Sequence, residues 1–150
     1  MENGLGLVHQ IRQMYGTKEM DIREYSPLVL AYMGDCIYDL LIRTLLVEDK
    51  NRPVNVLHKT ATRYVKAEAQ AAIVDAIMDQ LTEEEQSVYR RGKNAKPHSV
   101  SKGGTVGEYH RATGLEALLG YLYLKDDMPR LMEIVKIGLE AYNGGIDLWK

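Results

Sequence analysis

Residues 26–48, SPLVLAYMGDCIYDLLIRTLLVE, predict one long helix. Ser26 is a residue type that caps helix N-termini, and Pro27 follows at the first helical position, where a missing N–H is tolerated. Beyond them, apolar residues cover nearly the whole circumference, a pattern typical of a central core helix or a membrane span. Because a carboxylate near the midpoint of a bilayer is costly, Asp35 favours the buried helix of a soluble domain.

The length and composition are those of one globular domain. The chain has 150 residues, of which 45% are hydrophobic and 27% charged. A net charge of −2 means that any contact with nucleic acid must come from a local basic patch. Cys36 is the only cysteine, which excludes an internal disulfide, and we expect it to be a small buried hydrophobe. The N-terminus has no secretory pattern, so we expect a cytoplasmic protein.

The rest of the chain predicts further helices and no sheet, because no stretch alternates with period two. Residues 1–20 predict a short helix or a loose arm that ends at Gly16. Helical periodicity recurs over four more segments: 56–80 with Asn55 as its cap and a bend near 64–66, 82–91 with a Thr82–Glu85 capping box, 108–124, and 128–142 capped by Asp126 and Asp127. The predicted fold class is therefore all-α, a helical bundle.

Two acids stand alone in apolar helices, Asp35 in the first core helix and Glu116 in the second. Two packed helices would bring them together, and paired carboxylate oxygens suit a hard divalent cation. The alternative is structural, because each carboxylate could cap a neighbouring helix or form an ion pair. The arginines considered for such a pair are Arg43, Arg63 and Arg111. We expect Asp39, one turn after Asp35, to form a salt bridge at the helix edge.

Residues 90–102 form the basic segment of the chain. Most of it lies in residues 92–107, which predict a long Gly-rich loop. The candidate RNA-binding side chains are Arg90, Arg91, Lys93, Asn94, Lys96 and Lys102, with His98 among them. Flexible cations and Gly-rich turns suit phosphate contacts, which position a protein on nucleic acid without reading bases. The alternative is a solvated loop with no binding role.

Two motifs resemble those of the ribonuclease III family. Residues 31–40, AYMGDCIYDL, resemble its signature helix, and residues 111–120, RATGLEALLG, resemble its second acidic motif. Between them, LHKTATRYVKAEAQ at 57–70 and RRGKNAK at 90–96 are similar to Mini-ribonuclease III, the branch without a separate double-stranded-RNA-binding domain.

The resemblance implies a ribonuclease III endonuclease domain over residues 21–142, with an N-terminal extension over 1–20 and a C-terminal tail over 143–150. Such a domain is an all-helical homodimer that hydrolyses double-stranded RNA to 5′-phosphate products. The implied cofactor is Mg²⁺, for which Mn²⁺ substitutes.

The resemblance also implies the site residues. By position, Asp35 and Glu116 match the family's metal-binding aspartate and glutamate, so they are the implied catalytic and metal-binding residues. The general family pattern has two further acids, at positions where this chain has Ala31 and Thr113. Both departures resemble the Mini-III branch, and they leave fewer carboxylates for a second ion.

The implied substrate is structured precursor RNA, and for the Mini-III branch the ends of large-subunit (23S) ribosomal RNA. The basic segment would grip the duplex, an assisting ribosomal protein is a further candidate partner, and no membrane is involved. Two alternatives remain. One is a catalytically inactive ribonuclease III fold that binds RNA or associates with ribosomes. The other is an unrelated helical metal-dependent phosphohydrolase of small molecules. A cluster of His and Asp ligands would favour it, and the sequence shows none.

Overall fold

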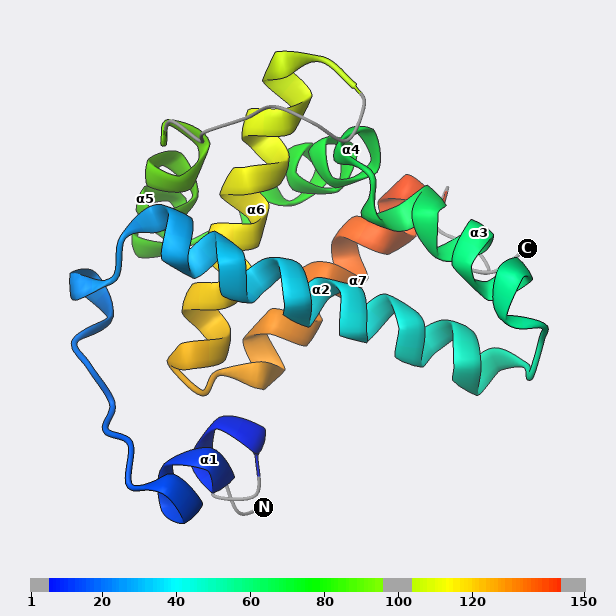
Figure 1. Ribbon diagram of the computed structural model, residues 1–150. Helices are drawn as coiled ribbons and strands as arrows, with labels where there is room; N and C mark the ends of the chain where they lie inside the picture. The colour runs from blue at the N-terminus through cyan, green and yellow to red at the C-terminus, as the bar shows by residue number, and fades with distance from the viewer. Residues whose placement is uncertain (1–5, 96–103, 144–150) are drawn as a thin grey trace.

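The computed structural model describes residues 6–95 and 104–143. In chain order its elements are α1 (Leu7–Tyr15), the 3-10 turn η2 (Ile22–Glu24), α2 (Pro27–Asp49), α3 (Val54–Val65), α4 (Ala67–Ile77), the 3-10 turn η3 (Met78–Gln80), α5 (Glu83–Lys93), α6 (Val106–Leu124) and α7 (Met128–Tyr142). No strand occurs in either described range, so the predicted all-α fold class is confirmed (Figure 1). The same ranges contain no helix that is both long and apolar enough to cross a bilayer.

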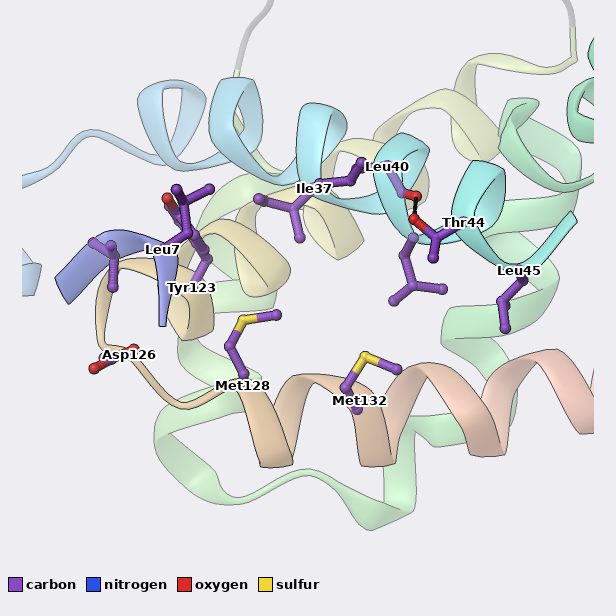
Figure 2. Close-up of a pocket in the computed structure, with 11 residues that line it drawn as sticks. Leu7, Ile37, Leu40, Thr44, Leu45, Tyr123, Asp126, Met128 and Met132 are labelled. Carbon is purple, nitrogen blue, oxygen red and sulfur yellow. Dashed lines mark hydrogen bonds between the residues drawn. The ribbon is translucent and has the colours of Figure 1, made fainter. Parts of the chain in front are cut away.

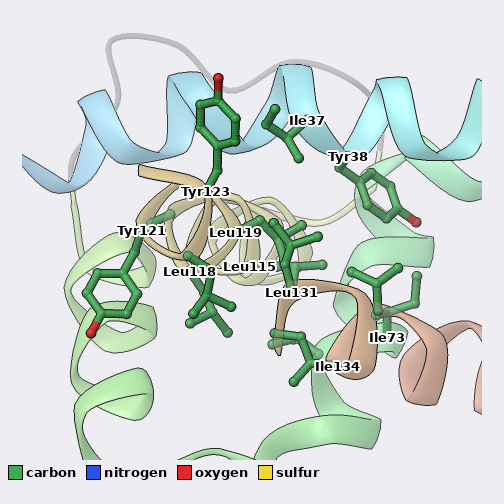
Figure 3. Close-up of a cluster of buried hydrophobic side chains, with 14 of the residues drawn as sticks. Ile37, Tyr38, Ile73, Leu115, Leu118, Leu119, Tyr121, Tyr123, Leu131 and Ile134 are labelled. Carbon is green, nitrogen blue, oxygen red and sulfur yellow. The ribbon is translucent and has the colours of Figure 1, made fainter. Parts of the chain in front are cut away.

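Helix α6 forms the centre of the core. All its residues from Ala112 to Tyr123 are buried, and α2, α4, α5 and α7 pack around it. Leu115, Leu118 and Leu119 lie on the same side of the core as side chains of α4 and α7 (Figure 3). The chain therefore surrounds its second predicted core helix more completely than its first.

Helix α2 lies across α6 and is buried on one face only, so the prediction of an all-round buried helix is wrong (Figure 1). Ile37, Tyr38 and Ile42 face the core, whereas Tyr32 is 78% exposed. Cys36 is also exposed, which corrects its prediction as a buried hydrophobe. The reason is geometric: a helix that crosses a central helix can press only one side against it, however apolar its other side is.

The crossing of α2 and α6 is a contact between backbones. A Cβ atom added to Gly34 of α2 would lie 1.7 Å from the Glu116 carbonyl oxygen, and one added to Gly120 of α6 would lie 1.9 Å from the Leu30 carbonyl oxygen. No side chain fits between the helices at these two points. The contact therefore sets the turn of α2 that carries Asp35 directly against the turn of α6 that carries Glu116.

Three helix starts follow the predicted caps. Ser26 Oγ accepts from the Val29 N–H, and the capping box of Thr82 and Glu85 is present. Asp127 caps α7. A second capping box at the start of α6, formed by Thr105 and Glu108, was not predicted.

The predicted bend near 64–66 is confirmed, because Lys66 takes an extended conformation and divides the segment 56–80 into α3 and α4. Two predicted boundaries are wrong. Helix α3 starts after Pro53, which places Asn55 inside its first turn. Gly92 does not end α5. It lies within the helix, where a Cβ would come 2.6 Å from the Ala117 Cβ of α6, so this glycine serves close helix packing.

The N-terminal segment is a short helix docked on the core, one of the two predicted forms. Val8 of α1 is buried, and Arg12 Nη2 donates a hydrogen bond to the Leu124 carbonyl at 2.8 Å. The helix ends at Gly16, whose positive φ of 67° suits a glycine cap.

A partly buried ion pair joins α5 to α7. Arg130 contacts both oxygens of Glu85, with Nε–Oε2 at 2.9 Å and Nη2–Oε1 at 2.8 Å. Hydrogen bonds from Arg130 hold the pKa of Glu85 below its ordinary value of 4.5. Because the pKa is lower in the folded state, the stabilisation is present above about pH 4.5 and is lost as the pH falls through the folded-state value.

We expect Gly34→Ala to lower the free energy of unfolding by at least about 3 kcal/mol, because the new methyl group meets backbone that cannot move aside. Chemical denaturation measures the change. Gly107→Ala is the matched control: it lies in the first turn of α6, where a Cβ added to Gly107 would come no closer than 3.7 Å to Arg111 Nη1. An equal loss in both variants would contradict the backbone contact at Gly34.

We expect Arg130→Met to lower the free energy of unfolding by about 3 kcal/mol at pH 7, because it leaves a buried carboxylate without its cation. The loss should be smaller at pH 3, because below pH 4.5 the unfolded chain takes up a proton and the stabilisation from the lowered pKa of Glu85 decreases. Arg23→Met is the control, since the Arg23–Asp21 pair is exposed and screened by solvent. A loss at pH 3 as large as that at pH 7 would show that the ion pair is not its cause.

Candidate metal and RNA site

Asp35 lies on the solvent-facing side of α2, one residue after the crossing glycine. It lines a hollow of about 380 Å³ between α2 and α3, together with Asp39, His58 and Lys66. Asp39 pairs with Arg43, with Oδ2–Nε at 3.2 Å, so the predicted salt bridge at the helix edge is confirmed. Asp35 is therefore a carboxylate that a ligand can reach from solvent.

Glu116 is in the opposite environment, because its side chain belongs to the buried stretch of α6 and the residue is 8% exposed. Its Oε2 accepts a hydrogen bond from Gln70 Nε2 of α4 at 3.3 Å. The same nitrogen donates to the Val65 carbonyl at 2.9 Å. Gln70 was not predicted from the sequence. An amide flanked by alanines in an apolar helix could have indicated a buried polar contact there.

The three arginines of the structural alternative have other contacts. Arg43 pairs with Asp39, and Arg111 Nε lies 3.5 Å from Asp75 Oδ1. The Arg63 guanidinium lies over the Tyr64 ring, 5.7 Å from its centroid. These contacts weaken the alternative that the two acids serve as partners of those arginines.

The two positions that lack an acid are both buried. Ala31 faces the core from α2, and Thr113 Oγ1 donates to the Tyr109 carbonyl at 3.0 Å within α6. Within residues 6–95 and 104–143 there is no group of three or more His, Cys, Asp or Glu side chains suited to a metal ion. Two carboxylates fit a Mg²⁺ ion, since this ion keeps several waters and is often held by one or two carboxylates.

An apolar cavity of about 290 Å³ lies between α1, α2 and α7 (Figure 2). Its polar lining residues are Thr44, which donates to the Leu40 carbonyl, and Asp126. The cavity lacks the paired carboxylates that a cation needs, so it is not the candidate site.

The basic residues that can be placed lie at the C-terminal end of α5 and not in a loop. Three exposed cations lie in its last turn: Arg90, Arg91 and Lys93. Asn94 is the C-cap, and cations suit this end of the helix dipole. Lys96, His98 and Lys102 lie outside the described residues. Gly92 packs against Thr113, Gly114 and Ala117, so the basic end of α5 lies beside the turn that carries Glu116.

A comparison with protein families matches the Ribonuclease III domain over residues 28–127, which is most of the chain. The chain belongs to the ribonuclease III family. The matched range runs from α2 to the turn before α7, and it contains both acids of this ribonuclease III domain together with its basic segment.

Relatives place this ribonuclease III domain within a branch. It is 51% identical to a Mini-ribonuclease 3 of a Thermoanaerobacter species over 125 residues, covering 83% of this chain and 87% of the relative. It is 41% identical to a Mini-ribonuclease 3 of Clostridium tetani over 125 residues, covering 83% of each protein. The resemblance to the Mini-III branch is thus confirmed.

A solved structure agrees with the fold of the ribonuclease III domain. A crystal structure of a Fusobacterium nucleatum protein superposes with a TM-score of 0.72 at 35% sequence identity. The match covers 84% of this chain and 98% of that protein. The helical arrangement around α6 is therefore shared with an experimentally determined relative.

Proposed function

We propose that this ribonuclease III family endoribonuclease hydrolyses double-stranded regions of structured precursor RNA in the cytoplasm and leaves 5′-phosphate ends. Its cofactor is Mg²⁺, with Mn²⁺ as a substitute. The substrate we favour is the precursor of large-subunit (23S) ribosomal RNA, cut near its ends. The observation that supports the proposal is the placement of Asp35 and Glu116 on touching turns of α2 and α6.

Asp35 and Glu116 are the residues that would hold the cation. When bound, such an ion polarises a phosphoryl oxygen and lowers the pKa of water. Asp35 is exposed, so its carboxylate can contact the side of the site that the substrate reaches. Glu116 is buried and hydrogen-bonded to Gln70, so its carboxylate is held in a fixed orientation on the protein side.

The basic end of α5 is the proposed grip on the RNA. A-form RNA is recognised through its shape, phosphates and 2′-hydroxyls, which suits flexible cations with no base-reading groups. Arg91 and Lys93 are exposed beside the Glu116 turn, where phosphates of a duplex at the acids would lie within reach. Lys96 and Lys102 would extend the same contact.

The exposed face of α2 supports a homodimer. Tyr32 is 78% exposed and Leu40 is 54% exposed, although both are large and lie on α2, which packs across the core. Tyr32, Cys36 and Asp35 line one surface hollow of about 400 Å³, so the apolar residues border the acid. A twofold axis through this face would set two sites on one surface, and each site would then cut one strand of a duplex.

We expect Asp35→Asn to reduce the cleavage rate of a labelled RNA duplex by about 10³-fold, equal to about 4 kcal/mol, because it removes a charged ligand of the cation. Duplex binding in EDTA and the thermal midpoint should remain near those of the wild type. Mapping the ends of products from total precursor RNA would show whether the lost cuts lie in 23S ribosomal RNA.

Asp39→Asn is the matched control, one turn along the same helix, and it should cleave within about threefold of the wild type since its carboxylate pairs with Arg43 at the helix edge. Full activity of Asp35→Asn would remove this residue from the mechanism. A wild-type protein that binds duplex RNA but never cuts it would favour the inactive RNA-binding fold.

We expect the double variant Arg91→Ala with Lys93→Ala to weaken duplex binding and to lower its salt slope, by up to about one for each lost phosphate contact. A binding titration at several salt concentrations measures the slope. Lys50→Ala with Lys136→Ala is the control, since it removes the same charge from the end of α2 and from α7. Equal slopes in both double variants would remove the end of α5 from the RNA interface.

A further inference from the structure

Gln70 of α4 is a buried polar residue next to the candidate cation site. It is 2% exposed, and its neighbours Ala69, Ala71 and Ile73 are buried apolar side chains. A buried amide needs partners for two N–H groups and one oxygen, since each unmet group costs about 1–3 kcal/mol. The contacts of this one amide therefore indicate what surrounds it.

The orientation of the amide follows from its partners. Nε2 lies 2.9 Å from the Val65 carbonyl oxygen and 3.3 Å from Glu116 Oε2. Both partners are acceptors, so turning the amide over would set oxygen against oxygen at both contacts. The nitrogen therefore faces Val65 and Glu116, and both of its protons are in use.

The other amide atom has no such partner. Gln70 Oε1 is buried, and among residues 6–95 and 104–143 it accepts no hydrogen bond. Buried polar atoms in native proteins are nearly always satisfied, and an exception calls for a water or an ion at that place. The atom belongs to a side chain that already touches the Glu116 carboxylate.

We propose that Gln70 is a positioning residue of the cation site, with Nε2 fixing the Glu116 carboxylate and Oε1 accepting a hydrogen bond from a water of the bound divalent cation. This inference rests on the proposed function, because it assumes a cation at Asp35 and Glu116. It accounts for a site with only two carboxylates, since a hydrated ion needs acceptors for its waters as well as direct ligands. The ligand class is a hydrated Mg²⁺ or Mn²⁺ ion.

A purely structural role is the competing explanation. The bond to Val65 holds the last turn of α3 at the point where Lys66 breaks the helix. Gln86 makes comparable bonds elsewhere, from its Nε2 to the Met78 carbonyl at 3.4 Å and the Leu81 carbonyl at 3.3 Å. Gln86 thus provides a matched control, an amide that joins helix ends through two carbonyls.

The test is a titration of the full-length protein with Mn²⁺ alone, in which electron paramagnetic resonance measures the free ion. Gln70→Met keeps the shape and removes both amide functions, and we expect it to bind Mn²⁺ about 10–100-fold more weakly than the wild type. Gln86→Met should bind as the wild type does. Circular dichroism melts show whether each variant is folded at the titration temperature.

Gln70→Glu keeps an oxygen at this place and covers the case in which Gln70→Met does not fold. At pH 8 its carboxylate repels that of Glu116, so the protein without metal should melt at a lower temperature than the wild type. Because a cation between the carboxylates relieves this repulsion, we expect Mn²⁺ to raise the thermal midpoint of Gln70→Glu by more than it raises that of the wild type.

The outcomes separate this inference from the proposed function. Wild-type Mn²⁺ affinity in a folded Gln70→Met, or a midpoint shift of Gln70→Glu no larger than that of the wild type, would overturn the role of Gln70 and leave the acid pair intact. If Glu116→Gln bound Mn²⁺ as tightly as the wild type, that result would overturn the cation site itself, and the role of Gln70 with it.

Discussion

The contact between the backbones of α2 and α6 is the constraint on which the site depends. Gly34 and Gly120 allow the two helices to touch with no side chain between them. That contact lets two acids separated by 81 positions in the chain lie on adjoining turns. It also explains why a glycine directly precedes Asp35: a larger residue would move the carboxylate away from α6.

The turns that carry the two acids touch, and the environments of the two side chains differ. Asp35 is exposed in a hollow beside α3, whereas Glu116 is buried and bonded to Gln70. An exposed ligand can exchange water and meet substrate, while a buried, hydrogen-bonded ligand keeps its orientation. Because Ala31 and Thr113 supply no carboxylate, the proposed ion would depend more on amide and water contacts.

What the sequence predicted well was local. The cap at Ser26, the capping box at Thr82 and the cap at Asp127 involve residues three positions apart, so short-range pattern is enough to place them. The sequence also singled out the two acids, because a lone carboxylate in an apolar helix is unusual and because the motifs around them resemble a known family; their role at a cation stays a prediction.

What the sequence could not predict depended on packing. Apolar composition made α2 seem the buried helix, yet α6 is the enclosed one and Cys36 faces solvent. Gly92 was predicted as a helix end because glycine often follows the last turn of a helix. Its packing against Ala117 involves a residue distant in the sequence, so the sequence pattern did not indicate it. Gln70 was overlooked for the same reason: its meaning comes from Glu116, 46 positions away.

The most direct test of the account is the position of Mn²⁺ in a crystal of this protein, located by anomalous diffraction at the manganese edge. We expect one peak within coordination distance of carboxylate oxygens from both Asp35 and Glu116, with water at its remaining positions. A peak bound by only one of these two side chains, or located elsewhere in the protein, would contradict it.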